Sequence, residues 1–90
     1  MPPEPDWRID NCKRLRGAKF RRKAYRAPSK EWDHDHCAGC WVKFMEIDAP
    51  DILHDGYATT AEYKLGEDYE WVCPTCFVEL RTVMNWIEVV

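Results

Sequence analysis

The chain has 90 residues, a formal net charge of −3 and five cysteines. It contains no apolar run long enough to cross a bilayer and no apolar N-terminal segment typical of an export signal, so we expect a cytoplasmic protein whose cysteines stay reduced. A single domain of this size buries a modest fraction of its surface, and a bound metal is a common additional source of stability.

The charged residues are divided unevenly along the chain. Residues 1–30 carry ten Lys and Arg against three Asp and Glu, whereas residues 31–90 carry three Lys and Arg against thirteen Asp and Glu. We expect the two parts to attract each other in the folded protein. A basic segment can also bind nucleic acid, and an acidic surface can bind a basic protein. The acidic part argues against a dedicated DNA-binding protein.

Residues 1–6 contain three prolines and no core-forming pattern, which predicts a flexible tail before a single domain over residues 7–90. In the basic segment that follows, the apolar residues fit neither the helical nor the strand period, and Gly17 interrupts it. We therefore expect two short strands, over 11–16 and 19–25.

The cations of residues 13–26 are interleaved with aromatic side chains, as in proteins that bind single-stranded nucleic acid. The candidate nucleic-acid contacts are Arg21, Arg22 and Lys23. A solvated pair of charged strands is the alternative. Cys12, within the first predicted strand, is expected to be a small buried residue without a metal-binding role.

Two C-x-x-C pairs dominate the remaining sequence, which is predicted to form a zinc core over residues 31–90. The pairs are Cys37–Cys40 and Cys73–Cys76. Four thiolates suit the tetrahedral preference of Zn²⁺, and a closed set of four cysteines is a structural site. The sequence thus predicts one structural Zn²⁺ held by Cys37, Cys40, Cys73 and Cys76. Gly39 suits a tight turn in which a backbone N–H approaches a sulfur.

Short strands and turns are expected between the two pairs, with a final strand over 69–72. The last segment is the clearest helix. Pro74 suits its first position and makes Cys73 the N-cap, with the helix dipole pointing at two thiolates. An apolar stripe follows at helical spacing, made of Phe77, Leu80, Met84 and Ile87.

This order of elements resembles a treble-clef zinc finger: a zinc knuckle, short antiparallel strands, then one C-terminal helix that carries the last two ligands. A WDHDHCxxCW…WxCPxCF pattern also resembles a group of short bacterial zinc-binding proteins of unknown function. That resemblance rests on Tyr25, Trp32 to Cys37, Cys40, Trp41, Phe44, Gly56 to Thr59, Trp71 to Cys73, Cys76, Phe77 and Trp86. It implies a zinc module in a small α+β domain and no particular activity.

The string Asp33, His34, Asp35, His36 has two readings. It is similar to the Asp-His-Asp-His string of phage recombination endonucleases, which implies a metal-dependent, HNH-like nuclease. In that family the string lies between the cysteine pairs, whereas here it precedes the first pair. We therefore expect the four residues to form a second shell that orients the zinc knuckle.

The functional prediction is a non-enzymatic, zinc-stabilised module that binds another protein, with an inhibitor or immunity-type protein as one example. It rests on the acidic body, the small size and the absence of a clear catalytic set. Five tryptophans exceed what a small core needs, and an exposed one would mark a partner surface. The alternatives are nucleic-acid binding through residues 13–26 and the nuclease reading above. Membrane binding is not expected.

Overall fold

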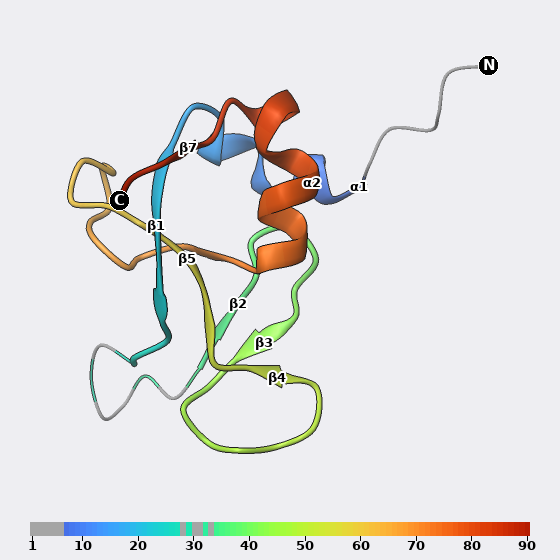
Figure 1. Cartoon of the computed structure of the whole chain (residues 1–90), viewed down its shortest axis with the longest axis vertical. Helices are drawn as coiled ribbons and strands as arrows, with labels where there is room; N and C mark the ends of the chain where they lie inside the picture. Colours follow the sequence, from blue (N-terminus) through green and yellow to red (C-terminus); the bar gives the residue numbers. More distant parts are fainter. Residues whose placement is uncertain (1–6, 28, 30–31, 33) are drawn as a thin grey trace.

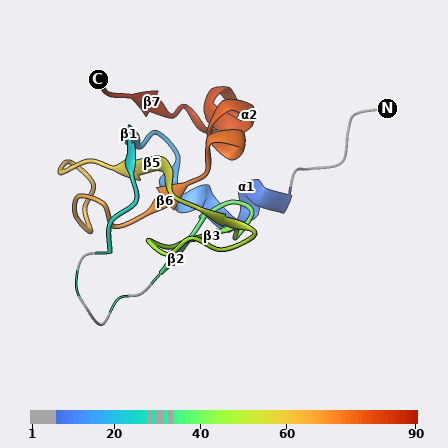
Figure 2. The same ribbon diagram turned by 60° about the horizontal axis from the view of Figure 1, so that its bottom comes forward.

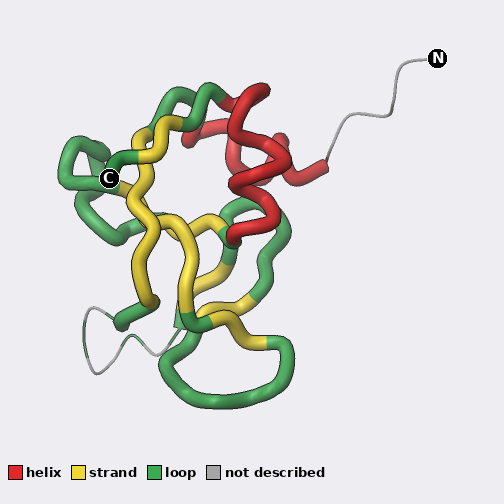
Figure 3. The backbone as a smooth tube through the Cα atoms, in the orientation of Figure 1, coloured by secondary structure: helices red, strands yellow, loops and turns green. Residues whose placement is uncertain are grey.

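Two small sheets and two α-helices form the fold in a computed structural model of the chain, which describes residues 7–27, 29, 32 and 34–90 (Figure 1). The predicted tail, residues 1–6, lies outside the described residues. Figure 3 shows the helices gathered toward one end of the molecule and the loop between the third and fourth strands at the opposite end. The predicted α+β class is confirmed, with one more helix than expected.

The larger sheet has four strands in the order β6-β5-β1-β7. Strand β5 pairs antiparallel with β1 and with β6, and β7 pairs parallel with β1. The strands are β1 (Lys19–Ala24), β5 (Asp55–Thr59), β6 (Trp71–Val72) and β7 (Ile87–Glu88).

The smaller sheet has the order β2-β3-β4, with β3 antiparallel to β2 and parallel to β4. Its strands are β2 (Asp35–His36), β3 (Lys43–Phe44) and β4 (Ile52–Leu53). A β-bridge between Cys37 and Trp71 links the two sheets and brings the first cysteine pair to the strand that precedes the second.

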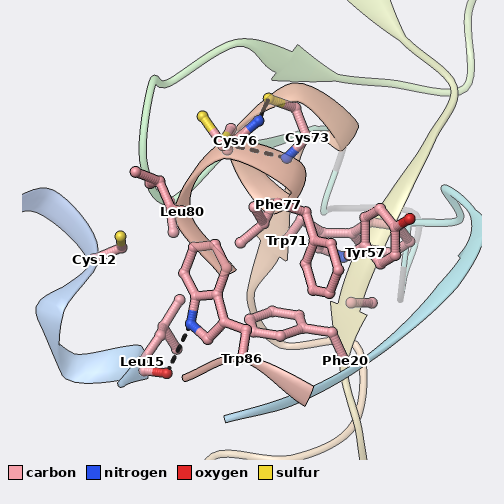
Figure 4. Close-up of a cluster of buried hydrophobic side chains, with 14 of the residues drawn as sticks. Cys12, Leu15, Phe20, Tyr57, Trp71, Cys73, Cys76, Phe77, Leu80 and Trp86 are labelled. Carbon is pink, nitrogen blue, oxygen red and sulfur yellow. Dashed lines mark hydrogen bonds between the residues drawn. The ribbon is translucent and has the colours of Figure 1, made fainter. Parts of the chain in front are cut away.

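Aromatic side chains fill the space between helix α2 (Pro74–Met84) and the larger sheet (Figure 4). Phe77 stacks on Tyr57 at 3.8 Å between ring centroids, and Phe20 packs edge-on against both Phe77 and Trp86. The indole N–H of Trp86 donates to the carbonyl of Leu15 at 2.9 Å. This bond ties the end of the chain to its beginning.

A second aromatic cluster, formed by Tyr25, Phe44 and Trp71, lies where the two sheets meet. Gly56 faces this cluster, and a Cβ at that position would lie 2.8 Å from the Phe44 ring and 2.9 Å from the carbonyl of Val72. Only glycine therefore lets β5 approach so closely.

The prediction of a strand over 11–16 is wrong. That segment falls in helix α1 (Trp7–Cys12) and the 3₁₀ turn η1 (Lys13–Leu15). The helical turns bring Cys12 and Leu15, three residues apart, into the core and leave Lys13 and Arg14 exposed. The predicted break at Gly17 is present: its φ is 77° and its N–H donates to the carbonyl of Met84.

The other predicted elements are largely confirmed. Strand β1 covers most of 19–25, and β6 forms only the second half of the strand expected over 69–72. Helix α2 begins at Pro74 with Cys73 as N-cap and ends at Asn85, which has a left-handed conformation. Because the helix stops there, Ile87 lies in β7 and is half exposed, outside the apolar stripe. No helix in the described part of the chain has the length and apolar character that crossing a membrane requires.

Candidate metal centre

The two cysteine pairs meet at one place in the fold. The Sγ atoms of Cys37, Cys40, Cys73 and Cys76 all lie within 4.8 Å of one another, and none of the five cysteines forms a disulfide. In Figure 1 the turn between β2 and β3 reaches the start of α2, and Figure 4 shows Cys73 and Cys76 at that helix end. The four predicted ligand residues therefore form a cluster that can hold a metal ion.

The first pair lies in a tight turn that directs backbone N–H groups at a sulfur. The N–H groups of Gly39 and Cys40 donate to the Sγ of Cys37 at 3.4 and 3.5 Å. A Cβ on residue 39 would lie 3.3 Å from the Sγ of Cys76. The predicted approach of a backbone N–H to a sulfur is therefore confirmed at Gly39, and the missing side chain also leaves room for the second cysteine pair.

The second pair uses the N-terminus of α2. The Sγ of Cys73, the N-cap, accepts a hydrogen bond from the N–H of Cys76 at 3.3 Å, and the N–H of Cys73 donates to the Sγ of Cys37 at 3.3 Å. The positive end of the helix dipole and these N–H groups stabilise negative charge on sulfur.

The spacing of the sulfurs fits a tetrahedral ion. With a metal–sulfur distance of about 2.3 Å, a tetrahedron places its sulfurs about 3.8 Å apart. The Sγ atoms of Cys40 and Cys73 lie 3.7 Å apart although 33 positions separate the residues. The cluster thus needs little rearrangement to accept an ion with thiolate ligands.

The clustered thiols shift one another's pKa values. Hydrogen bonds from Cys73 and Cys76 lower the pKa of Cys37 to about 2, and the backbone N–H groups add to this effect. Hydrogen bonding with Cys37 raises the pKa of Cys73 to about 12, and contact with Cys37 and Cys73 also raises the pKa of Cys76. Three buried thiolates and the half-buried thiolate of Cys40 would therefore repel one another strongly, and a divalent cation removes that repulsion.

Helix α1 covers one side of the cluster, which the sequence did not predict. The guanidinium of Arg8 donates to the Sγ of Cys76 at 3.6 Å and to Glu79 at 2.8 Å. The amide of Asn11 donates to the carbonyl of Gly39 at 2.8 Å. These contacts join residues far apart in sequence, and no local pattern around Arg8 or Asn11 points to them.

The Asp/His string lies partly outside the described residues, because Asp33 is not among them. The carboxylate of Asp35 accepts hydrogen bonds from the hydroxyl of Tyr25 and the indole of Trp32, both at 2.8 Å. Burial raises the pKa of Asp35, although these two bonds oppose the shift. The rings of His34 and His36 pack edge to face at 4.9 Å. The predicted second-shell role of the string stays a prediction.

Carboxylates from residues 31–90 pair with the cations of strand β1. The expected attraction between the basic and acidic parts of the chain is thus present at this strand. Arg21 lies 3.9 Å from Glu67, and two shorter pairs, Arg22 with Asp55 and Lys23 with Asp68, have distances of 2.7 Å. The three candidate nucleic-acid contacts therefore all face carboxylates within the domain.

Cys12 is fully buried and stands apart from the four clustered cysteines, as expected. Its thiol donates to the carbonyl of Arg8 at 3.1 Å, one helical turn earlier. Cys12 therefore packs α1 onto the core.

No protein-family model, curated protein or solved structure matches the chain.

Proposed function

We propose that the four cysteines hold one structural Zn²⁺ and that the zinc-stabilised domain is a non-enzymatic, cytoplasmic module that binds another protein. Four clustered sulfurs, backbone N–H groups directed at them and the absence of disulfides support a metal with soft ligands. All four ligand positions would be filled by protein, as in structural sites, so the ion would have no open position for catalysis.

A treble-clef arrangement is part of this proposal. It is supported by a cysteine turn between β2 and β3 and by a second pair at the first turn of α2. The additional helix α1 and the parallel strand β7 lie outside that pattern. We also propose that the chain is related to the short bacterial zinc-binding proteins that its sequence pattern resembles.

The observation that carries the binding proposal is an exposed tryptophan pair beside the metal cluster. Trp41 directly follows Cys40 and is 63% exposed, and Trp7 at the start of α1 is 57% exposed. Their rings pack edge to face with centroids 6.2 Å apart. Tryptophan is enriched among the residues that contribute most to protein interfaces. Since metal binding would fix the turn that ends at Cys40, the backbone next to Trp41 would be held in one position.

A pocket of about 600 Å³ adjoins Trp41 and is also lined by Asn11 and Arg14. It lies between the cysteine turn and α1, so an apolar side chain of a partner can enter beside the indole ring.

The partner that fits this surface is a protein with basic side chains around an apolar one. The chain has a net charge of −3, and four of its exposed acidic residues make no ion pair within the part of the chain that the structure describes. These are Asp10 and, in the loop between β3 and β4, Glu46, Asp48 and Asp51. Asp10 lies in α1 with Trp7, so positive charge on the partner would be attracted to the same face.

The test uses the zinc-loaded full chain to capture proteins from an extract of the cells that express its gene. Trp41→Ala is the test variant and Val83→Ala, on the exposed side of α2, is the matched control. We expect a basic protein that the wild type and Val83→Ala both capture. The purified partner should bind Trp41→Ala at least about tenfold more weakly, since truncating an interface hot spot typically costs ≥ 2 kcal/mol.

Two results would contradict the proposal. One is a purified partner whose affinity does not change in Trp41→Ala or Trp7→Ala. The other is Mg²⁺- or Mn²⁺-dependent DNA cleavage by the pure chain that His34→Ala/His36→Ala abolishes, which would favour the nuclease reading.

A further inference from the structure

A second pocket has a volume of about 340 Å³. It is formed by the connection from η1 into β1 and by the loop that follows β5. Figure 2 shows these two segments near each other at the end of the larger sheet. The polar groups that line it are four cations and two hydroxyls, with Glu62 as the one carboxylate: Arg14, Arg16, Lys19, Lys64, Thr60 and Tyr63.

Two hydroxyls in this pocket are buried without a hydrogen-bond partner. They are the Oγ1 of Thr60 and the phenol oxygen of Tyr63. Thr60 is only 7% exposed. A buried hydroxyl without a partner is unfavourable, so an unpaired hydroxyl in a native structure usually has a ligand or an ordered water. The phenol of Tyr63 is protonated at neutral pH because the ordinary pKa of tyrosine is about 10. Burial raises the pKa of Tyr63 further, although the neighbouring Arg14 opposes the shift.

The charge of the pocket is only partly compensated. Arg14 pairs with Glu70, and Lys19 pairs with Glu62. Arg16, by contrast, donates to the carbonyl of Val83, which carries no charge. Lys64 makes no ion pair within the described part of the chain. This differs from the middle of β1, where each of Arg21, Arg22 and Lys23 has a carboxylate.

We infer that this pocket binds a phosphomonoester group. Its four cations outnumber its single carboxylate, which suits a dianion better than the single charge of a carboxylate or a phosphodiester. Guanidinium and ammonium groups form strong charge-assisted hydrogen bonds with phosphate oxygens. The hydroxyls of Thr60 and Tyr63 are closed to solvent in this structure and would donate to the remaining oxygens once their side chains turn toward the pocket. The volume exceeds that of phosphate alone and leaves room for the carbon atoms that it esterifies.

The tryptophan pair does not line this pocket, although Arg14 borders both this pocket and the one beside Trp41. The inference itself uses no contact of the tryptophan pair. The phosphate could belong to a small metabolite or to a phosphorylated side chain. The chemistry that the pocket recognises is the same in both cases.

The experiment titrates the zinc-loaded full chain by calorimetry with inorganic phosphate, O-phosphoserine, a phosphoserine peptide and a single-stranded oligonucleotide. We expect saturable 1:1 binding of the phosphomonoesters. A peptide that binds much more tightly than free O-phosphoserine assigns the site to a phosphorylated side chain, and equal affinities assign it to a small metabolite.

The variants distinguish a specific binding site from non-specific electrostatic attraction. Lys64→Gln and Arg16→Gln remove cations from exposed side chains and should each weaken O-phosphoserine binding about fivefold or more. Lys43→Gln is the matched control, because Lys43 is also exposed and without an ion pair among the described residues but lies in β3. Its affinity should stay within twofold of the wild type. Thr60→Val and Tyr63→Phe, which keep the side-chain shape, should also weaken binding.

Three outcomes would overturn the inference. These are no saturable binding of any phosphomonoester at millimolar concentration, an equal loss in Lys43→Gln and Lys64→Gln, or an oligonucleotide that binds as tightly as O-phosphoserine. The first would mean that water alone satisfies the two hydroxyls.

Discussion

The guanidinium of Arg8 lies against the sulfur of Cys76, with 3.6 Å between its Nη1 and the Sγ atom. The same nitrogen is 2.8 Å from Glu79, one turn further along α2. Helix α1 is thereby attached to the metal cluster and to the helix that carries the second cysteine pair. A cation in this position offsets part of the negative charge that four thiolates bring to a divalent ion.

Arg8→Ala should therefore weaken zinc binding and lower stability. Hydrogen bonds to charged groups contribute roughly 1.5–3 kcal/mol, and the Arg8 side chain is 17% exposed. We expect a loss of about 2 kcal/mol, measured as zinc affinity in a chelator competition and as urea unfolding of the zinc form. Arg21→Ala is the matched control, because its pair with Glu67 is exposed and such pairs contribute only about 0–1 kcal/mol. Equal losses in the two variants would contradict a specific role for Arg8.

Alanine substitutions at Gly56 and Gly39 should differ in how much they destabilise the fold. Gly56→Ala places a Cβ 2.8 Å from the Phe44 ring and 2.9 Å from the carbonyl of Val72, so ring and backbone must both move. We expect a loss of about 3 kcal/mol, at the upper end for overpacked cores. In Gly39→Ala the tightest contact of the added Cβ is with the Sγ of Cys76, at 3.3 Å, while Arg8 and the Sγ of Cys37 lie at ordinary contact distances, so the change should chiefly reduce zinc affinity. Chelator competition measures the zinc affinity of each variant, and thermal unfolding at saturating zinc measures the stability of the folded form. A Gly39→Ala variant that is the more destabilised of the two at saturating zinc would contradict this order.

Asp35 tests whether the Asp/His string is structural. Asp35→Ala removes the acceptor for the hydroxyl of Tyr25 and the indole of Trp32, so we expect a loss of about 1–3 kcal/mol. Asp35→Asn keeps one carbonyl acceptor and removes the unfavourable buried charge, so its loss should be smaller. Urea unfolding of both zinc-loaded variants measures this order, and the reverse order would show that the charge itself is needed.

The basic strand should not act as a nucleic-acid surface. Arg21, Arg22 and Lys23 each face a carboxylate, so little of their charge is free for phosphate groups. Because ion pairs of this kind at the surface contribute little to stability, replacing all three with Ala should leave the fold and zinc content unchanged. Any oligonucleotide affinity of the wild type should be weak and fall steeply with salt. A sub-micromolar, sequence-selective complex at about 0.15 M salt, lost in the triple variant, would make the strand the working surface.

The features that could be predicted from the sequence are those encoded within a few residues. The spacing within each cysteine pair, Pro74 after an N-capping Cys73 and the period of Phe77, Leu80 and Met84 each specify local structure directly. Strand β1 could be predicted because Gly17 interrupts the basic segment and separates it from the residues before.

The missed features depend on contacts between distant segments. Helix α1 has six residues and one fully buried side chain, Cys12, so it shows no helical period. Its contacts with the cluster, through Arg8 and Asn11, span 68 and 28 positions. Strand β7 is likewise specified by pairing with β1 rather than by its own two residues. Tertiary packing selects such short elements, and no window of the sequence contains the partner.

The most direct measurement is the zinc content of the purified chain, combined with circular dichroism before and after removal of the metal by a chelator. We expect one Zn²⁺ per chain and loss of most structure on chelation, because the binding free energy of a structural zinc, about 10–16 kcal/mol, is comparable to the whole stability of a small domain. Cys40→Ala should lose the metal, whereas Cys12→Ala, which removes the buried cysteine outside the cluster, should retain it. A stoichiometry clearly different from one, or a chain that stays fully folded without metal, would contradict the account.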